Sequence, residues 1–169
     1  MRGAAIGKIN PMTAAKKDYD AVIATPLGPL GINAERALTN IDFVSARTAL
    51  KSARTPLARR VCTQLKAYFA DARTQFQLPL ATRGSDFQQQ VWRAMCRIPS
   101  GKAQSYGELA RKIKSSPRAV GGACRANPIP IIVPCHRVVA VSGLGGFMGA
   151  TRGRALQIKR WLLEHERII

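Results

Sequence analysis

The most constraining stretch of this chain is residues 129–141, an apolar run that a Cys-His-Arg triplet interrupts at 135–137. The largely β-branched segments 131–133 and 138–141 predict two buried strands, because fully buried strands are nearly continuous in apolar residues. Pro134 ends the first strand, since proline has no N–H to give to a sheet. The triplet is therefore expected at a turn between buried elements. That place suits a nucleophile, and a structural cysteine beside a surface histidine fits it equally well.

Composition limits what kind of protein this can be. Hydrophobic residues make up 46% of the 169 positions, enough for a core, and no run of about 18 apolar residues predicts a membrane span. Residues 1–19 lack the apolar stretch of a secretory signal and predict a flexible tail. The four cysteines have no CxxC spacing and only two histidines accompany them, which disfavours disulfides and zinc. We therefore expect a protein of the reducing cytoplasm without a bound metal.

Positive charge is the strongest feature of the composition. The net charge is +18 and the pI is near 11.1. Residues 87–163 contain 13 basic residues and a single acid, Glu108. Such a field attracts polyanions, because binding releases their counterions. Nucleic acid is therefore favoured as the partner over a merely solvated basic face. A membrane surface is less favoured, since the charge is not confined to one long amphipathic helix.

Residues 20–80 predict a small α/β domain. The apolar segments 21–25, 30–32 and 40–44 predict strands, and turn-forming prolines and glycines separate the first two. A threonine cap and a first-turn proline then open a helix over 55–69. Nothing in this part indicates catalytic chemistry.

After a linker at 78–84, residues 85–169 predict a mostly helical domain. Ser85, Ser105 and Ser116 each precede a helix as its N-cap, the first two in capping boxes. The helices after the second and third serines are short and joined by a tight turn, which is typical of a helix-turn-helix. The predicted fold class is an α/β N-terminal subdomain plus a mostly α C-terminal domain with a winged-helix-like helix-turn-helix.

Two glycine-rich segments lie on either side of the triplet. Gly121 and Gly122 fall inside the second short helix, where two glycines cost about 2 kcal/mol relative to alanine. Close approach of a partner's backbone would explain that cost, and so would tight packing against the protein's own core. The loop 142–149 has neither the GxGxxG nor the P-loop pattern. It predicts a flexible pocket wall for a flat ligand.

A thiol beside an imidazole in a cationic setting indicates thiolate chemistry. His136 and the positive field are expected to lower the pKa of Cys135 from its usual value of about 8.5. A histidine base also needs an acceptor that orients it. Glu108 already caps a helix, which leaves Glu164 or Glu166 for this role.

The motif at 134–139, Pro-Cys-His-Arg-Val-Val, resembles the signature of the O6-alkylguanine-DNA alkyltransferases, also called methylated-DNA–protein-cysteine methyltransferases. The similarity covers residues 20–169 and is densest after Ser85. Six further segments fit the family: 86–92, 98–99, 105–110, 118–123, 127–130 and 161–166. Phe147 stands where many members have tyrosine, and Cys124 stands where relatives often have an apolar residue. The range of accepted adducts is therefore left open.

The resemblance implies a nucleophile, a base and supporting residues. Cys135 would take the alkyl group from O6 of guanine irreversibly. His136 would deprotonate this cysteine through a bound water, and Glu166 would orient the histidine. Asn127 would brace the turn that holds the cysteine. Tyr106 would hydrogen-bond the flipped base and help to rotate its phosphate.

The resemblance also implies a DNA-binding helix and a base pocket. Arg118 would fill the gap that the flipped base leaves in the stack, and small residues would let the helix enter the minor groove. The implied DNA-binding residues are Arg118, Ala119, Gly121, Gly122, Ala123 and Arg125. The implied pocket residues are Tyr106, Cys124, Val138, Phe147, Met148 and Lys159, with backbone groups near Val138 and Met148 on the guanine edge.

The implied activity is single-turnover repair of double-stranded DNA that contains O6-alkylguanine, with O4-alkylthymine as a further substrate. No cofactor and no metal would be needed. We expect a cytoplasmic, nucleoid-associated monomer with no membrane partner. The alternative is a non-enzymatic helix-turn-helix protein that binds DNA damage. The presence of Cys135 argues against it, because the alkyltransferase-like proteins of that kind lack the active cysteine.

Overall fold

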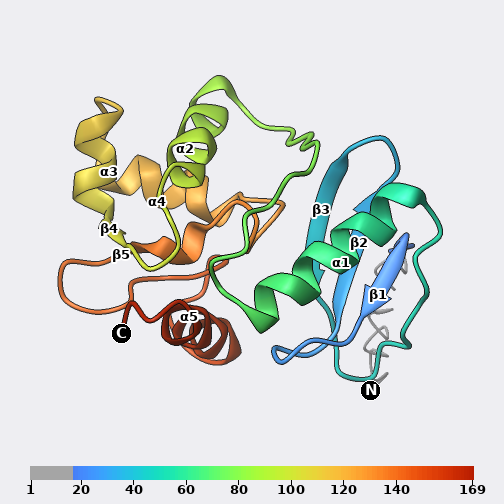
Figure 1. The fold of residues 1–169 in the computed structure, drawn as a ribbon. Helices are drawn as coiled ribbons and strands as arrows, with labels where there is room; N and C mark the ends of the chain where they lie inside the picture. The colour runs from blue at the N-terminus through green and yellow to red at the C-terminus, as the bar shows by residue number, and fades with distance from the viewer. Residues whose placement is uncertain (1–16) are drawn as a thin grey trace, which may run out of the picture.

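The N-terminal part of the structure is a three-stranded antiparallel sheet with one helix packed against it (Figure 1). This computed structural model describes residues 17–169. The strands pair in sequence order. Thr55 caps the helix by accepting a hydrogen bond from the Ala58 backbone N–H, as predicted. The elements are β1 (Ala21–Ile23), β2 (Leu30–Ala34), β3 (Leu38–Phe43) and α1 (Pro56–Ala70).

Most of the predicted tail, residues 1–16, lies outside the described residues. Residues 17–19 belong to the folded part, because two of their side chains are bound to the sheet. The Lys17 Nζ atom lies 2.6 Å and the Tyr19 hydroxyl 2.8 Å from Oδ2 of Asp42 on β3. Residues 17–19, predicted as part of the tail, are therefore attached to the N-terminal sheet.

The C-terminal part is mostly helical and contains a short parallel strand pair. Ser85 and Ser105 form the predicted capping boxes, and Ser116 caps its helix as predicted. Helices α3 and α4 pack against each other as the predicted helix-turn-helix, so the fold class is confirmed. Within residues 17–169, no helix has both the length and the apolar character needed to cross a membrane. The elements are α2 (Asp86–Cys96), β4 (Gln104–Ser105), α3 (Tyr106–Lys112), α4 (Pro117–Arg125), η1 (Cys135–Arg137), β5 (Val138–Val139) and α5 (Arg154–His165).

The strand predicted at 131–133 is wrong, because this segment is a closed turn. The Val133 N–H donates to the Ile129 carbonyl (2.9 Å), and Ile131 has a positive φ of 75°. Neighbouring prolines remove N–H groups that a sheet would need, and the Val133 N–H bonds within the turn instead. Of the second predicted strand, 138–141, the first two residues form a strand that pairs with β4, and Ala140 forms only an isolated bridge with Gly143.

The two parts share one hydrophobic core and are also joined by hydrogen bonds. The Ile41 N–H on β3 donates to the Pro128 carbonyl (2.9 Å), immediately before the turn that carries the triplet. Arg154 at the start of α5 donates to the carbonyls of Leu27 and Val44, at 3.4 Å each. The sheet therefore supports the segment that holds Cys-His-Arg.

Candidate active site

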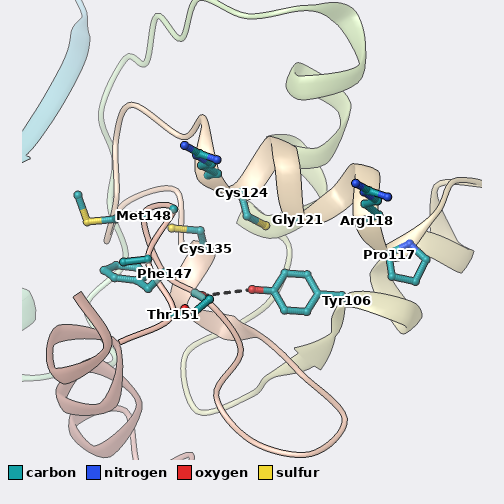
Figure 2. A pocket seen from close by; sticks show the side chains of 13 residues that line it. Tyr106, Pro117, Arg118, Gly121, Cys124, Cys135, Phe147, Met148 and Thr151 are labelled. Atoms are coloured by element: carbon teal, nitrogen blue, oxygen red, sulfur yellow. Dashed lines mark hydrogen bonds between the residues drawn. The ribbon is translucent and has the colours of Figure 1, made fainter. Parts of the chain in front are cut away.

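Cys135 opens η1 at an open pocket of about 430 Å³ (Figure 2). Helix α4 forms one side of the pocket, and the glycine-rich loop at 146–151 forms another. The Cys135 N–H donates to the Val133 carbonyl (2.9 Å). Asn127 holds the preceding turn at both ends, because its Nδ2 donates to the Val133 carbonyl (2.7 Å) and its Oδ1 accepts from the Ile129 N–H (3.0 Å). This is the position that the predicted bracing role requires.

A buried carboxylate holds the histidine next to the nucleophile. The Nε2 atom of His136 lies 2.8 Å from Oε1 of Glu166, and both side chains are fully buried. Arg137 donates from Nε to Oε2 (2.8 Å) and from Nη2 to Oε1 (2.9 Å) of the same carboxylate. The Tyr68 hydroxyl on α1 also donates to Oε1 (2.7 Å). Of the two candidate acids, the structure thus brings Glu166 to the histidine and leaves Glu164 exposed.

Burial sets the charge state of the site. It raises the pKa of the Cys135 thiol, and the Asn127 side chain and the Lys159 charge offset this only in part. Burial likewise lowers the pKa of His136 despite its carboxylate partner. For Glu166, burial alone would raise the pKa, but hydrogen bonds from its two basic neighbours lower it to about 2. The expected lowering of the cysteine pKa is therefore wrong: the resting pair is a neutral thiol and a neutral imidazole.

Lys159 lies behind the pocket wall instead of in it. Its Nζ donates to the carbonyls of Val138 (2.6 Å) and Gly146 (2.9 Å) and lies 5.7 Å from the centre of the Tyr106 ring. The Tyr106 hydroxyl donates to the same Gly146 carbonyl (3.2 Å). Burial lowers the pKa of Lys159 to about 8. Neither Val138 nor Lys159 is among the residues that line this cavity, and the ammonium group of Lys159 binds backbone carbonyls and anchors the loop.

The other four predicted pocket residues do line the cavity. Phe147 packs edge to face against Phe43 of β3, with ring centroids 6.3 Å apart. The Cys124 Sγ lies 3.6 Å from the Met95 Sδ on α2, and burial raises the pKa of this second thiol to about 12. Gly146 and Gly149 of the loop predicted as a pocket wall also line the cavity, and three lining residues were not predicted: Pro117, Ala150 and Thr151.

The protein's own core does not require the glycines of α4. A Cβ placed on Gly122 would meet nothing within 4 Å, and one on Gly121 would meet only the Tyr106 ring at 4.0 Å. Of the two explanations for the glycine pair, core packing is therefore wrong. Ala123 does face the core: it is 3% exposed, and its carbonyl accepts from Nε1 of Trp92 (2.9 Å). Its predicted DNA contact is corrected, since α2 covers it. The exposed predicted residues of α4 are Arg118, Gly122 and Arg125, with Ala119 and Gly121 half-buried.

The chain matches known sequences over almost its whole length. Residues 19–82 match the model of the 6-O-methylguanine DNA methyltransferase, ribonuclease-like domain, and residues 86–168 match that of its DNA binding domain. A constitutive methylated-DNA–protein-cysteine methyltransferase of Bacillus subtilis is 39% identical over 163 residues, which cover 89% of this chain and 96% of that protein. This chain belongs to the 6-O-methylguanine DNA methyltransferase family. A methylated-DNA–protein-cysteine methyltransferase of Mycobacterium tuberculosis is 50% identical over 107 residues, 62% of either chain.

Solved structures have the same fold as this member of the methyltransferase family. The crystal structure of the Mycobacterium tuberculosis O6-methylguanine methyltransferase superposes with a TM-score of 0.73 at 40% identity, over 86% of this chain and 90% of that one. A structure of Mycobacterium tuberculosis OGT in complex with DNA gives 0.71 at 40% identity, over 86% and 91%. An O6-methylguanine DNA methyltransferase from Methanococcus jannaschii gives 0.62 at 29% identity, over 88% and 93%.

Sequence reasoning assigned no role to two residues of the site in this family member. Arg137 lies inside the motif that identified the site, so its position could have drawn attention to it. Tyr68 lies 98 residues before Glu166, on a helix with no chemical motif. No local pattern could have found it. Among residues 17–169, no three His, Cys, Asp or Glu side chains gather in a way that could hold a metal ion.

Proposed function

We propose that this chain repairs double-stranded DNA by transferring the alkyl group of O6-alkylguanine to the Sγ atom of Cys135, once per molecule. The observation that carries this is a thiol at an open pocket, followed in the chain by a fully buried imidazole–carboxylate pair. The relatives' names, methylated-DNA–protein-cysteine methyltransferase, state both the donor and the acceptor of the group. The non-enzymatic alternative is not favoured, since these relatives are named as transferases.

The proposed reaction is one displacement. The Cys135 Sγ forms a bond to the alkyl carbon while the bond from that carbon to O6 breaks and leaves its electron pair on the guanine. The thiol proton passes through a water to His136 and ends on the guanine, so both products are neutral. Nδ1 of His136 suits this transfer, because it is buried and has no hydrogen-bond partner among residues 17–169. Glu166 stabilises the imidazolium as it forms. The thioether is not hydrolysed, so the cysteine is consumed.

Helix α4 is proposed to present the pocket to DNA. An alkylated base must leave the stack before it can be reached, and a pocket of about 430 Å³ has the size of a small-molecule site. The exposed Gly122 lets DNA approach the helix backbone. Arg118 is exposed and lies on the pocket rim, where it can replace the flipped base. Arg125, which also lines the pocket, lies so close to Gly149 that a Cβ there would be 2.8 Å from the arginine Nε.

Several finer features belong to the same proposal. Tyr106 exchanges its loop contact for a hydrogen bond to the base, and backbone groups near Met148 hold the guanine edge. O4-alkylthymine is a second substrate, and the protein works as a cytoplasmic monomer without a cofactor. We divide the chain into an N-terminal α/β domain at 20–80, which supports the site, and a DNA-binding and alkyl-transfer domain at 85–169.

The test is to mix the protein with duplex DNA that carries an O6-methylguanine with a labelled methyl group. We expect the label to move to the protein at one per molecule and peptide mapping to place it on Cys135. A protein that binds this duplex without taking up label would be a damage sensor. Label released over many turnovers would exclude a consumed cysteine.

Replacing Arg118 with alanine is expected to slow transfer from duplex DNA about tenfold, because an unfilled stack makes extrusion less favourable by about 1.4 kcal/mol. Transfer from free O6-benzylguanine needs no extrusion and should stay at the wild-type rate. The matched control is Arg93→Ala, which removes another exposed arginine, from α2. Equal slowing by both variants would show a general charge effect and exclude the gap-filling role.

Replacing Gly122 with leucine is expected to weaken binding of duplex DNA by about tenfold or more, because the side chain would stand between α4 and the DNA backbone. Folding should tolerate the change, since the space beside Gly122 is open. Gly122→Ala should raise the free energy of unfolding by about 1 kcal/mol, the helix propensity difference. Calorimetric unfolding and DNA titration measure the two effects. Unchanged DNA affinity in the leucine variant would contradict the docking of this face.

A further inference from the structure

One of the hydrogen bonds to the Glu166 carboxylate comes from the other domain of the chain. Tyr68 belongs to α1, which packs on the N-terminal sheet, and its side chain is fully buried. Its hydroxyl donates to Oε1 of Glu166 at 2.7 Å, the same oxygen that lies 2.8 Å from Nε2 of His136. No other tyrosine hydroxyl on the described residues contacts this carboxylate; those of Tyr19 and Tyr106 bind Asp42 and a loop carbonyl.

Packing alone does not explain the hydroxyl of Tyr68. Its ring contacts Phe69, Phe76 and His165 with centroids 5.2 to 5.5 Å apart, and a phenylalanine ring would fill that space. A buried hydroxyl is unfavourable unless it finds a partner, and this one finds the carboxylate that holds the histidine. Burial and that carboxylate raise the pKa of Tyr68, so the hydroxyl keeps its proton and remains a donor.

The geometry fixes how the carboxylate can meet the imidazole. Arg137 binds both oxygens of Glu166, and Tyr68 binds Oε1 from α1, so the carboxylate cannot rotate without breaking a buried hydrogen bond. An ionised carboxylate only accepts hydrogen bonds, so Nε2 of His136 must carry the proton. Nδ1 is then the unprotonated nitrogen, as a base requires, and it has no partner among residues 17–169.

We infer that Tyr68 is a positioning residue for alkyl transfer: through Oε1 of Glu166, its hydroxyl holds His136 in the tautomer whose free Nδ1 accepts the thiol proton. This rests on the proposed function, because it assumes that His136 is the base. It gives the N-terminal domain a direct part in the chemistry. The hydroxyl acts through two other side chains and touches neither the thiol nor the pocket.

The first test compares the histidine tautomers of the wild-type protein and of Tyr68→Phe. The chain has two histidines, so nitrogen NMR of the full protein labelled with ¹⁵N-histidine resolves both imidazoles. In the wild-type protein we expect His136 to be neutral and protonated at Nε2. In Tyr68→Phe we expect its nitrogen shifts to move toward a mixture of the two tautomers. A wild-type His136 protonated at Nδ1, or unchanged shifts in the variant, would overturn the inference.

The second test is the rate of Cys135 alkylation by free O6-benzylguanine, a reaction that does not require DNA binding. Tyr68→Phe should slow this reaction about tenfold, the effect of one hydrogen bond to a charged group. The matched control is Tyr19→Phe. It also removes a tyrosine-to-carboxylate hydrogen bond of 2.8 Å, but the acceptor is Asp42 on β3 and not Glu166. Equal slowing in both variants would mean a general loss of stability and overturn the inference.

A double-mutant cycle with Glu166→Gln separates this inference from the proposed function. If Tyr68 acts through the carboxylate, Tyr68→Phe should add almost no slowing in the Glu166→Gln background. The same tenfold slowing in both backgrounds would overturn the positioning role. If Glu166→Gln is slow and Tyr68→Phe alone is as fast as wild type, the inference fails and the proposed function stands. If Glu166→Gln is itself as fast as wild type, the role of the histidine–carboxylate pair in the proposed function is contradicted.

Discussion

Cys135→Ala is expected to abolish transfer of a labelled methyl group from duplex DNA to the protein. Cys135 is the thiol that combines a place on the pocket lining with a buried histidine as its chain neighbour. The variant should still bind duplex DNA, because the proposed docking groups lie on α4. Loss of the nucleophile therefore separates the two activities, and mass spectrometry of the protein with DNA titration measures both.

The matched control for this change is Cys124→Ala. Cys124 lines the same pocket, but its Sγ packs against the Met95 Sδ, and burial raises its pKa to about 12. The thiolate is the reactive form, and no histidine follows Cys124 in the chain to take its proton, whereas the buried His136 follows Cys135. This variant should therefore still become methylated. If Cys135→Ala took up label on Cys124 at the wild-type rate, the assignment of the nucleophile would be wrong.

Local chemistry made much of this fold predictable. Helix starts at Thr55, Ser85, Ser105 and Ser116 depend on hydrogen bonds between residues three apart, so a short window contains the whole cause. The predicted strand at 131–133 was wrong because an apolar run predicts burial more reliably than it predicts the backbone conformation. The prolines around this run favoured a turn, and burial itself was correct.

The residues of the site also fall into those that the local sequence predicts and those that it does not. Cys135 and its motif neighbours are adjacent in sequence, so the resemblance could place them. The Tyr68–Glu166 contact joins residues from two domains, and nothing local specifies it. The predicted lowering of the Cys135 pKa was wrong for a further reason. A pattern shows which charges are nearby in the chain, but burial outweighs those charges here, and burial is a property of the whole fold.

Glu166→Gln is the second change with a large expected effect, on both rate and stability. The amide cannot stabilise an imidazolium, so alkylation of Cys135 should slow about 100-fold, the lower end of what a positioned base contributes. The amide also leaves the Arg137 guanidinium, which is 11% exposed, without a charged partner. Breaking a buried ion pair in this way should lower the free energy of unfolding by about 3 kcal/mol.

The pH dependence of stability tests the same charge independently. The pKa of Glu166 is lowered to about 2 in the folded protein from an ordinary 4.5. A lowered pKa means that the contribution of this group is fully present above about pH 5 and is lost as the pH falls through the folded value. Wild-type unfolding free energy should therefore decrease between about pH 5 and pH 2 more steeply than that of Glu166→Gln. The matched control is Glu164→Gln, the exposed acid two positions earlier. It should keep the wild-type rate and the wild-type slope, and identical behaviour of the two variants would show that no buried charge holds the histidine.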